Sequence, residues 1–171
     1  MLGGELYHGD CLEIMPRIPK ESVDLVLCDL PYGTTASSWD KIIPMDKLWA
    51  EYTRILKPRG TVALFCVQPF TSLLVTHGLK GKLHYRYMWV WLKSNKTNFG
   101  NAHKQPLLRY LVRTYTDAGD MVLDNTMGSG STCVAAAIEG RRYIGIERDD
   151  KYYDIACARV AEAERQVRID T

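Results

Sequence analysis

Two short segments of this sequence carry residue types that could bind a nucleoside and act on an amine. The first, LDNTMGSGST, places Asp124 before a turn that contains Gly128, Ser129 and Gly130. Glycines let a ligand approach the backbone, and the free amides of a following helix favour carboxylate or phosphate groups. Further along, Glu147 ends an apolar run, where a carboxylate can accept both hydroxyls of a ribose. The pattern predicts a nucleoside-containing cofactor.

The glycine spacing limits which cofactor this loop suits. Dinucleotide-binding loops carry G-x-G-x-x-G, whereas here the third glycine position falls on Thr132 or Cys133. A nicotinamide cofactor is therefore disfavoured. Two glycines can also form a tight strand-to-helix turn without any ligand, and it is the downstream Glu147 that favours the binding role.

The second segment is Asp29-Leu30-Pro31-Tyr32, at the end of the apolar run VDLVLCDL. The Asp29 carboxylate and the Leu30 carbonyl could accept hydrogen bonds from an amino group. Pro31 restricts the turn, and Tyr32 offers a ring on which a planar base can stack. These groups could hold an aromatic amine. Taken alone, however, the tetrapeptide favours a simpler role as a strand end with a core tyrosine.

Alternating strands and helices would bring the two segments together. Apolar runs predict strands over residues 23–30, 61–67, 84–92, 121–124 and 142–147. Apolar residues at helical spacing predict helices over 46–57 with Asp46 as the N-cap, after Pro69, over 106–116, over 132–140 and from 149 towards 165. This order predicts an α/β fold with a single doubly wound, mostly parallel sheet and helices on both faces.

Composition sets the broad class of the protein. The 171 residues fit one domain, 1–171, large enough that neither disulfides nor a metal site is expected. The five cysteines lie mostly in apolar runs and form no C-x-x-C pair, which is typical of a reduced, cytoplasmic protein. No apolar stretch is long enough for a membrane span. A net charge of +2 decides nothing, but residues 80–113 contain basic and no acidic side chains, which suits either a DNA-facing surface or a solvated basic face.

The two segments, in this order, resemble the β-class of amino-group DNA methyltransferases, in which a catalytic D/S/N-P-P-Y motif precedes the cofactor motif. Besides DLPYG and LDNTMGSGST, the resemblance includes GDCLEIM, QPF and YIGIERDDKYYDIACARV, so it extends over most of the chain. It implies a Rossmann-like methyltransferase fold, S-adenosylmethionine as the cofactor and DNA as the partner.

The resemblance also implies a role for each matching residue. Asp29, Leu30, Pro31 and Tyr32 would form the catalytic tetrad, in which leucine replaces the first proline of the commoner motif. Aspartate at the first position points to adenine N6, because the cytosine-N4 enzymes usually carry serine there. The cofactor contacts would come from the ends of several strands: Asp10, Cys11, Asp29, Asp124, Thr126, Gly128, Ser129, Gly130, Ser131, Thr132 and Glu147. Glu147 would hold the ribose and Asp10 the adenine amino group, although a turn aspartate explains Asp10 equally well.

The implied reaction is site-specific methylation of the adenine N6 amino group in DNA. Hydrogen bonds to Asp29 and to the Leu30 carbonyl would localise the amine lone pair for direct displacement at the sulfonium methyl. The target adenine would be flipped out of the duplex and stacked on Tyr32.

The middle of the chain departs from the resemblance. Residues 93–106 form a short basic segment, predicted to be a loop, where the family carries a long target-recognition region. Three explanations stay open: a naturally reduced enzyme, an inactive deletion product, or a sequence that omits a segment. A homodimer would supply additional DNA contacts. The alternatives to an adenine-N6 DNA methyltransferase are a cytosine-N4 enzyme, an enzyme that methylates RNA or a protein amide, and a degenerate cofactor- or DNA-binding module without turnover. Restriction-modification, replication control and a phage role remain open.

Overall fold

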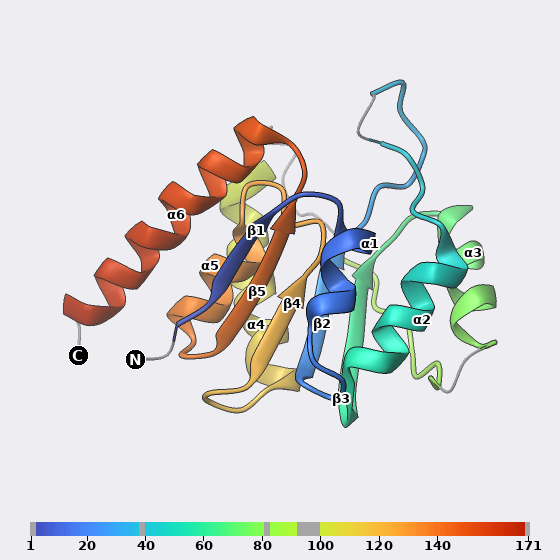
Figure 1. Cartoon of the computed structure of the whole chain (residues 1–171), viewed down its shortest axis with the longest axis horizontal. Coiled ribbons are helices and arrows are strands. Elements are labelled where there is room, and N and C mark those ends of the chain that lie inside the picture. Colours follow the sequence, from blue (N-terminus) through green and yellow to red (C-terminus); the bar gives the residue numbers. More distant parts are fainter. Residues whose placement is uncertain (1–2, 38–39, 81–82, 92–99, 170–171) are drawn as a thin grey trace.

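The computed structural model describes residues 3–37, 40–80, 83–91 and 100–169 (Figure 1). In chain order, the elements are β1 Glu5–His8, α1 Cys11–Ile14, the 3-10 turn Met15–Arg17, β2 Val23–Asp29, α2 Met45–Ile55, β3 Leu56–Phe65, α3 Phe70–Gly78, α4 Gly100–Tyr115, β4 Met121–Asp124, α5 Ser131–Ile138, β5 Arg142–Glu147 and α6 Asp150–Ile169. Within these ranges, no helix has the length and apolarity needed to cross a bilayer.

The strands form one parallel sheet in the order β1-β5-β4-β2-β3. Side chains alternate across a strand, so β2 serves two cores: Val26 and Cys28 pack with α1, α2 and α3, whereas Leu25 and Leu27 pack with α4, α5 and α6. Figure 1 shows these two helical layers on opposite faces of the sheet. The predicted doubly wound α/β fold is confirmed.

The sheet has a switch point between β2 and β4. These strands are neighbours, with Leu25 opposite Val122 and Val26 opposite Leu123. The chain leaves β2 towards α2 on one face and leaves β4 towards α5 on the other. The loops after β2 and β4 therefore diverge and leave a crevice at the carboxyl ends of the strands, where open α/β sheets place their ligands.

The predicted strand over residues 84–92 does not form in residues 83–91, and residue 92 lies outside the described residues. The aromatic side chains of this segment remain exposed. The Tyr87 and Trp89 rings stack with centroids 6.0 Å apart, and the Trp89 ring packs against Tyr110 of α4 with centroids 5.7 Å apart. Strand propensity reflects the fit to a pleated, half-buried surface, and this segment pairs with no strand.

Three helix and strand boundaries also differ from the predictions. Helix α4 includes Gly100–Tyr115 with Pro106 inside it, so residues 100–106 are helical instead of loop, while residues 93–99 lie outside the described residues. Strand β3 already begins at Leu56, because Leu56 pairs with Val23 before an irregularity in the register. Helix α2 has Pro44 at its N-cap, and Asp46 lies within the first turn, where it contacts His77 at 2.8 Å.

Candidate active site

A cavity of about 710 Å³ lies at the crevice between the two diverging loops. Its size is typical of a site for a small organic ligand. All of the predicted site residues except Gly130 line it: Asp10, Cys11, Asp29, Leu30, Pro31, Tyr32, Asp124, Thr126, Gly128, Ser129, Ser131, Thr132 and Glu147. The tertiary structure thus brings together residues from the ends of β1, β2, β4 and β5.

Asp124 is the buried acid of this cavity. Its side chain is 4% exposed, and one carboxylate oxygen accepts a hydrogen bond from the Thr126 amide at 3.2 Å. Burial raises the pKa of Asp124 to about 6, and hydrogen bonds from Thr132 and Thr126 offset this shift only in part. A cationic ligand group would stabilise the ionised form of this buried carboxyl.

Glu147 holds the glycine-bearing loop in place. Its Oε2 accepts the Gly128 amide at 2.8 Å, and its Oε1 accepts the amides of Arg148 and Asp149 at 2.9 and 2.8 Å. Gly128 has a φ of 52°, a conformation that favours glycine. In this structure, therefore, Glu147 organises the loop, and its Oε2 keeps acceptor capacity for a ligand hydroxyl.

Asp10 and Cys11 occupy the rim of the cavity next to β1. The Asp10 carboxylate caps α1 by accepting the Leu12 amide at 2.8 Å, which is the turn role that the sequence left open. Cys11 is buried, and burial raises the pKa of its thiol. The thiol is accordingly a packing group in the neutral form.

The Asp29 carboxylate stands at the end of β2 with two side-chain donors. The Tyr32 hydroxyl donates to Oδ1, and the Lys104 ammonium pairs with Oδ2. The two loops also touch directly, because the Thr126 hydroxyl donates to the Asp29 carbonyl at 3.3 Å. The carboxylate that could hold an amine is thus adjacent to the loop that could hold a cofactor.

Tyr32 does not stand free in the cavity. Its ring packs against Phe70 with centroids 5.4 Å apart, and burial, followed by the hydrogen bond to Asp29, raises the pKa of its hydroxyl. Its hydroxyl therefore orients Asp29, while the ring lines the cavity beside that carboxylate.

Lys104 is a site residue that the sequence analysis did not assign to the site. It lies on α4, 75 positions from Asp29, with its ammonium 5.4 Å from the centroid of the Phe65 ring. The prediction treated residues 93–106 as a loop, and the helical start of α4 is what carries Lys104 to the cavity.

Asp40 is a second residue that the sequence missed, and it shapes the loop after Tyr32. Its carboxylate accepts the amides of Gly33, Thr34 and Thr35 at 2.8, 2.9 and 2.7 Å. Although burial acts to raise its pKa, a hydrogen bond from the Thr35 side chain, together with these amide hydrogen bonds, lowers the pKa to about 2. An isolated aspartate in a loop gives no sequence signal for this role.

If the cavity carries out the methyl transfer that the resemblance implies, we expect Asp40→Ala to lower that transfer about tenfold or more, because misplacement of a reacting group is costly. Cofactor affinity should not change, because the expected cofactor contacts come from other loops. Transfer of labelled methyl and calorimetric titration of S-adenosylmethionine measure the two effects. Asp46→Ala, which removes an exposed carboxylate on α2, is the matched control. Unchanged transfer in Asp40→Ala would show that the three amide contacts do not position residues 29–32.

Asn125 links the loop after β4 to residues of α2 and β2 by buried hydrogen bonds. Its side chain is 2% exposed, and its Oδ1 accepts the Tyr52 hydroxyl at 2.6 Å and the Cys28 thiol at 3.0 Å. Because Tyr52 comes from α2 and Cys28 from β2, this buried cluster ties the loop after β4 to the other half of the sheet.

Comparison with known proteins finds similarity to DNA methyltransferases. Residues 104–158 match the family model described as DNA methylase. The DNA adenine methyltransferase YhdJ of Escherichia coli (strain K12) is 25% identical over 240 residues, which covers 91% of this chain and 82% of the relative.

Solved structures agree in fold. The M1.HpyAVI–SAM complex superimposes with a TM-score of 0.67 at 22% identity, covering 91% of this chain and 98% of that chain. The cytosine-N4-specific PvuII DNA methyltransferase gives a TM-score of 0.64 at 13% identity, covering 98% of this chain and 93% of that chain. The chain therefore has the Rossmann-like fold of S-adenosylmethionine-dependent methyltransferases, and it is similar to DNA methyltransferases along most of its length.

Proposed function

We propose that this chain is a DNA methyltransferase that transfers a methyl group from S-adenosylmethionine to the N6 amino group of adenine. The observation that carries the proposal is that the Asp29 carboxylate and the loop after Asp124 lie side by side in one cavity. The Thr126 hydroxyl joins them by donating to the Asp29 carbonyl. The similarity to a DNA adenine methyltransferase supports adenine as the base.

The residues of the cavity fit the cofactor chemically. A sulfonium compound with an ammonium group carries positive charge, and the buried Asp124 offers a carboxylate to it. Glu147 offers an acceptor to a ribose hydroxyl, and the turn at Gly128 allows close approach to the backbone. When bound, S-adenosylmethionine supplies an electrophilic methyl group.

Asp29 would hold the target amine. Each of its carboxylate oxygens has one donor within the protein, and an ionised carboxylate offers about four acceptor positions, so capacity for an amine remains. An N–H of the base donates to Asp29 and the other N–H to the Leu30 carbonyl, which localises the lone pair on nitrogen. As displacement proceeds, positive charge grows on that nitrogen, and a fixed carboxylate stabilises it.

The base would reach this site only outside the duplex. Extrusion of a nucleotide places its Watson–Crick edge in a pocket and its ring against apolar or aromatic walls. The ring of Tyr32, held between Asp29 and Phe70, lines the cavity at that edge. Pro31, next to it, restricts the backbone of the turn.

We infer further that residues 93–106 are shortened relative to the family and that the enzyme has a reduced recognition surface. The alignment with YhdJ runs over 240 residues although it covers only 91% of a 171-residue chain, so the relative carries positions that this chain lacks. A reduced surface predicts low sequence selectivity, or pairing with a second subunit.

The experiment that tests the proposal is methylation of mixed-sequence duplex DNA with labelled S-adenosylmethionine, followed by digestion to nucleosides. N6-methyl-2′-deoxyadenosine supports the proposal, whereas N4-methyl-2′-deoxycytidine would reassign the base. Label on RNA or protein alone would reassign the acceptor. Cofactor binding in calorimetry without transfer to any acceptor would identify a binding module.

The pKa of Asp124 predicts how cofactor affinity depends on pH. The carboxyl is ionised above about pH 6, so affinity should be constant from pH 7 to 8 and fall below pH 6 by up to about tenfold per pH unit. Calorimetric titration between pH 5 and 8 measures this profile. Asp124→Asn should bind weakly with little pH dependence, and a wild-type affinity that is flat across this range would contradict a role for the ionised form.

A further inference from the structure

Arg159 of α6 contacts the loop that follows β4, residues 125–130, which we call the cofactor loop. Arg159 is not among the residues that line the cavity. Its guanidinium donates from Nη1 to the Ser129 carbonyl at 2.5 Å, to the Ser129 hydroxyl at 2.7 Å and to the Ser131 hydroxyl at 3.2 Å. One side chain therefore engages three oxygens of the turn that follows β4.

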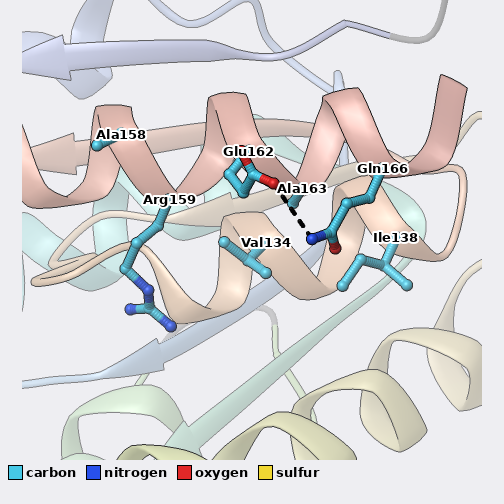
Figure 2. Close-up of a pocket in the computed structure, with 7 residues that line it drawn as sticks. All are labelled: Val134, Ile138, Ala158, Arg159, Glu162, Ala163 and Gln166. Carbon is cyan, nitrogen blue, oxygen red and sulfur yellow. Dashed lines mark hydrogen bonds between the residues drawn. The ribbon is translucent and has the colours of Figure 1, made fainter. Parts of the chain in front are cut away.

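The polar contacts of the Arg159 guanidinium are with the cofactor loop and the adjoining Ser131. It lies in a groove between α5 and α6, and Figure 2 shows it beyond Val134, on the side away from Ile138 and Gln166. Glu162, one turn further along α6, contacts Arg165 and Gln166 instead. Among the described residues, no carboxylate lies within ion-pair distance of Arg159, and its partial burial lowers its pKa.

The loop needs such an external support. Gly128 and Gly130 have φ values of 52° and 77°, and glycine has many alternative conformations. Glu147 fixes the loop on one side by accepting the Gly128 amide at 2.8 Å. Helix α6 approaches from the other side so closely that a Cβ on Gly130 would come within 2.9 Å of the Ala156 Cβ.

We propose that Arg159 is the positioning residue of the cofactor loop: it fixes the Ser129 carbonyl and holds the Ser129 and Ser131 hydroxyls as part of the scaffold. This inference rests on the proposed function, because it assigns the loop to the cofactor. It also revises the expected role of both serines, since their hydroxyls serve the loop geometry and Asp124, Thr126 and the loop backbone meet the ligand.

The test is calorimetric titration of S-adenosylmethionine combined with steady-state kinetics. Arg159→Met keeps the apolar stem but removes the donors, and it should weaken cofactor binding at least about tenfold, as expected for charge-assisted hydrogen bonds. The kcat at saturating cofactor and the KM for DNA should stay within about threefold, because Asp29 and its neighbours are unaffected. Arg159→Lys, which restores a charged donor, should recover part of the affinity.

Arg165→Met is the matched control, because Arg165 lies on the same helix and pairs with exposed Glu162. Equal affinity of wild type and Arg159→Met would overturn the inference. So would a fall in kcat without a change in affinity. Absence of binding by the wild-type protein would instead overturn the proposed function, so the two failures are distinguishable.

Ser129→Ala supplies a second test that does not depend on the stability of Arg159→Met. If the hydroxyl serves the scaffold, Ser129→Ala should weaken cofactor binding by a larger factor in the wild-type protein than in the Arg159→Lys variant. The reason is that the effects of substitutions within one hydrogen-bond network are not additive. Additive losses would mean that the hydroxyl contacts the cofactor directly, and they would overturn the scaffold role.

Discussion

Asp29→Asn is expected to lower the rate of methyl transfer to DNA by about 10²–10³-fold, in line with the loss of one fixed electrostatic group at a reacting centre. The amide has nearly the shape of the carboxylate but carries no charge, so it cannot offset the positive charge that grows on the amine. The substitution also removes the ion pair with Lys104. Single-turnover transfer at saturating cofactor measures the effect on the chemical step.

Cofactor affinity in the same variant should stay within about threefold of the wild type, because Asp124 and Glu147 remain and the Thr126 hydroxyl still meets the Asp29 carbonyl. Asp46→Asn is the control for a carboxylate outside the cavity. A wild-type rate in Asp29→Asn would show that another group holds the amine, and a loss confined to cofactor binding would move Asp29 from the reacting base to the cofactor.

Asp124→Asn is expected to have opposite effects on binding and on stability. Cofactor affinity should fall at least about tenfold at pH 8, because the buried carboxylate is lost. The free energy of unfolding of the cofactor-free protein should rise by about 3 kcal/mol at pH 8, because a buried carboxyl with a pKa of about 6 resists ionisation that is complete in the unfolded chain. Asparagine keeps an oxygen that can accept the Thr126 amide.

The pH dependence gives this prediction its sign. The pKa of Asp124 is higher in the folded protein than its ordinary value of 3.8. The folded state therefore binds more protons between about pH 4 and 6, and its stability falls as the pH rises through that range. The difference between Asp124→Asn and wild type should therefore be largest above pH 6 and vanish near pH 4. Urea unfolding at both pH values measures it. A variant that is less stable than wild type at pH 8 would contradict the burial penalty.

The sequence by itself determined the elements that carry the cavity and most of its lining. Buried apolar runs identified the strands that end at Asp29, Asp124 and Glu147. Gly128 and Gly130 identified the turn that follows Asp124. These features depend on residues close in the chain. The parallel order of the strands then brings their carboxyl ends to one edge, which is why the predicted residues line one cavity.

Only the tertiary structure decided which groups hold these residues in place. Lys104 reaches Asp29 across 75 positions, and Arg159 reaches Ser129 across 30. Such contacts depend on how helices pack on the sheet, and no local pattern specifies it. The same reason explains the segment 84–91, whose residues favour a strand but lie exposed along α4, since a strand requires a partner edge as well as a propensity.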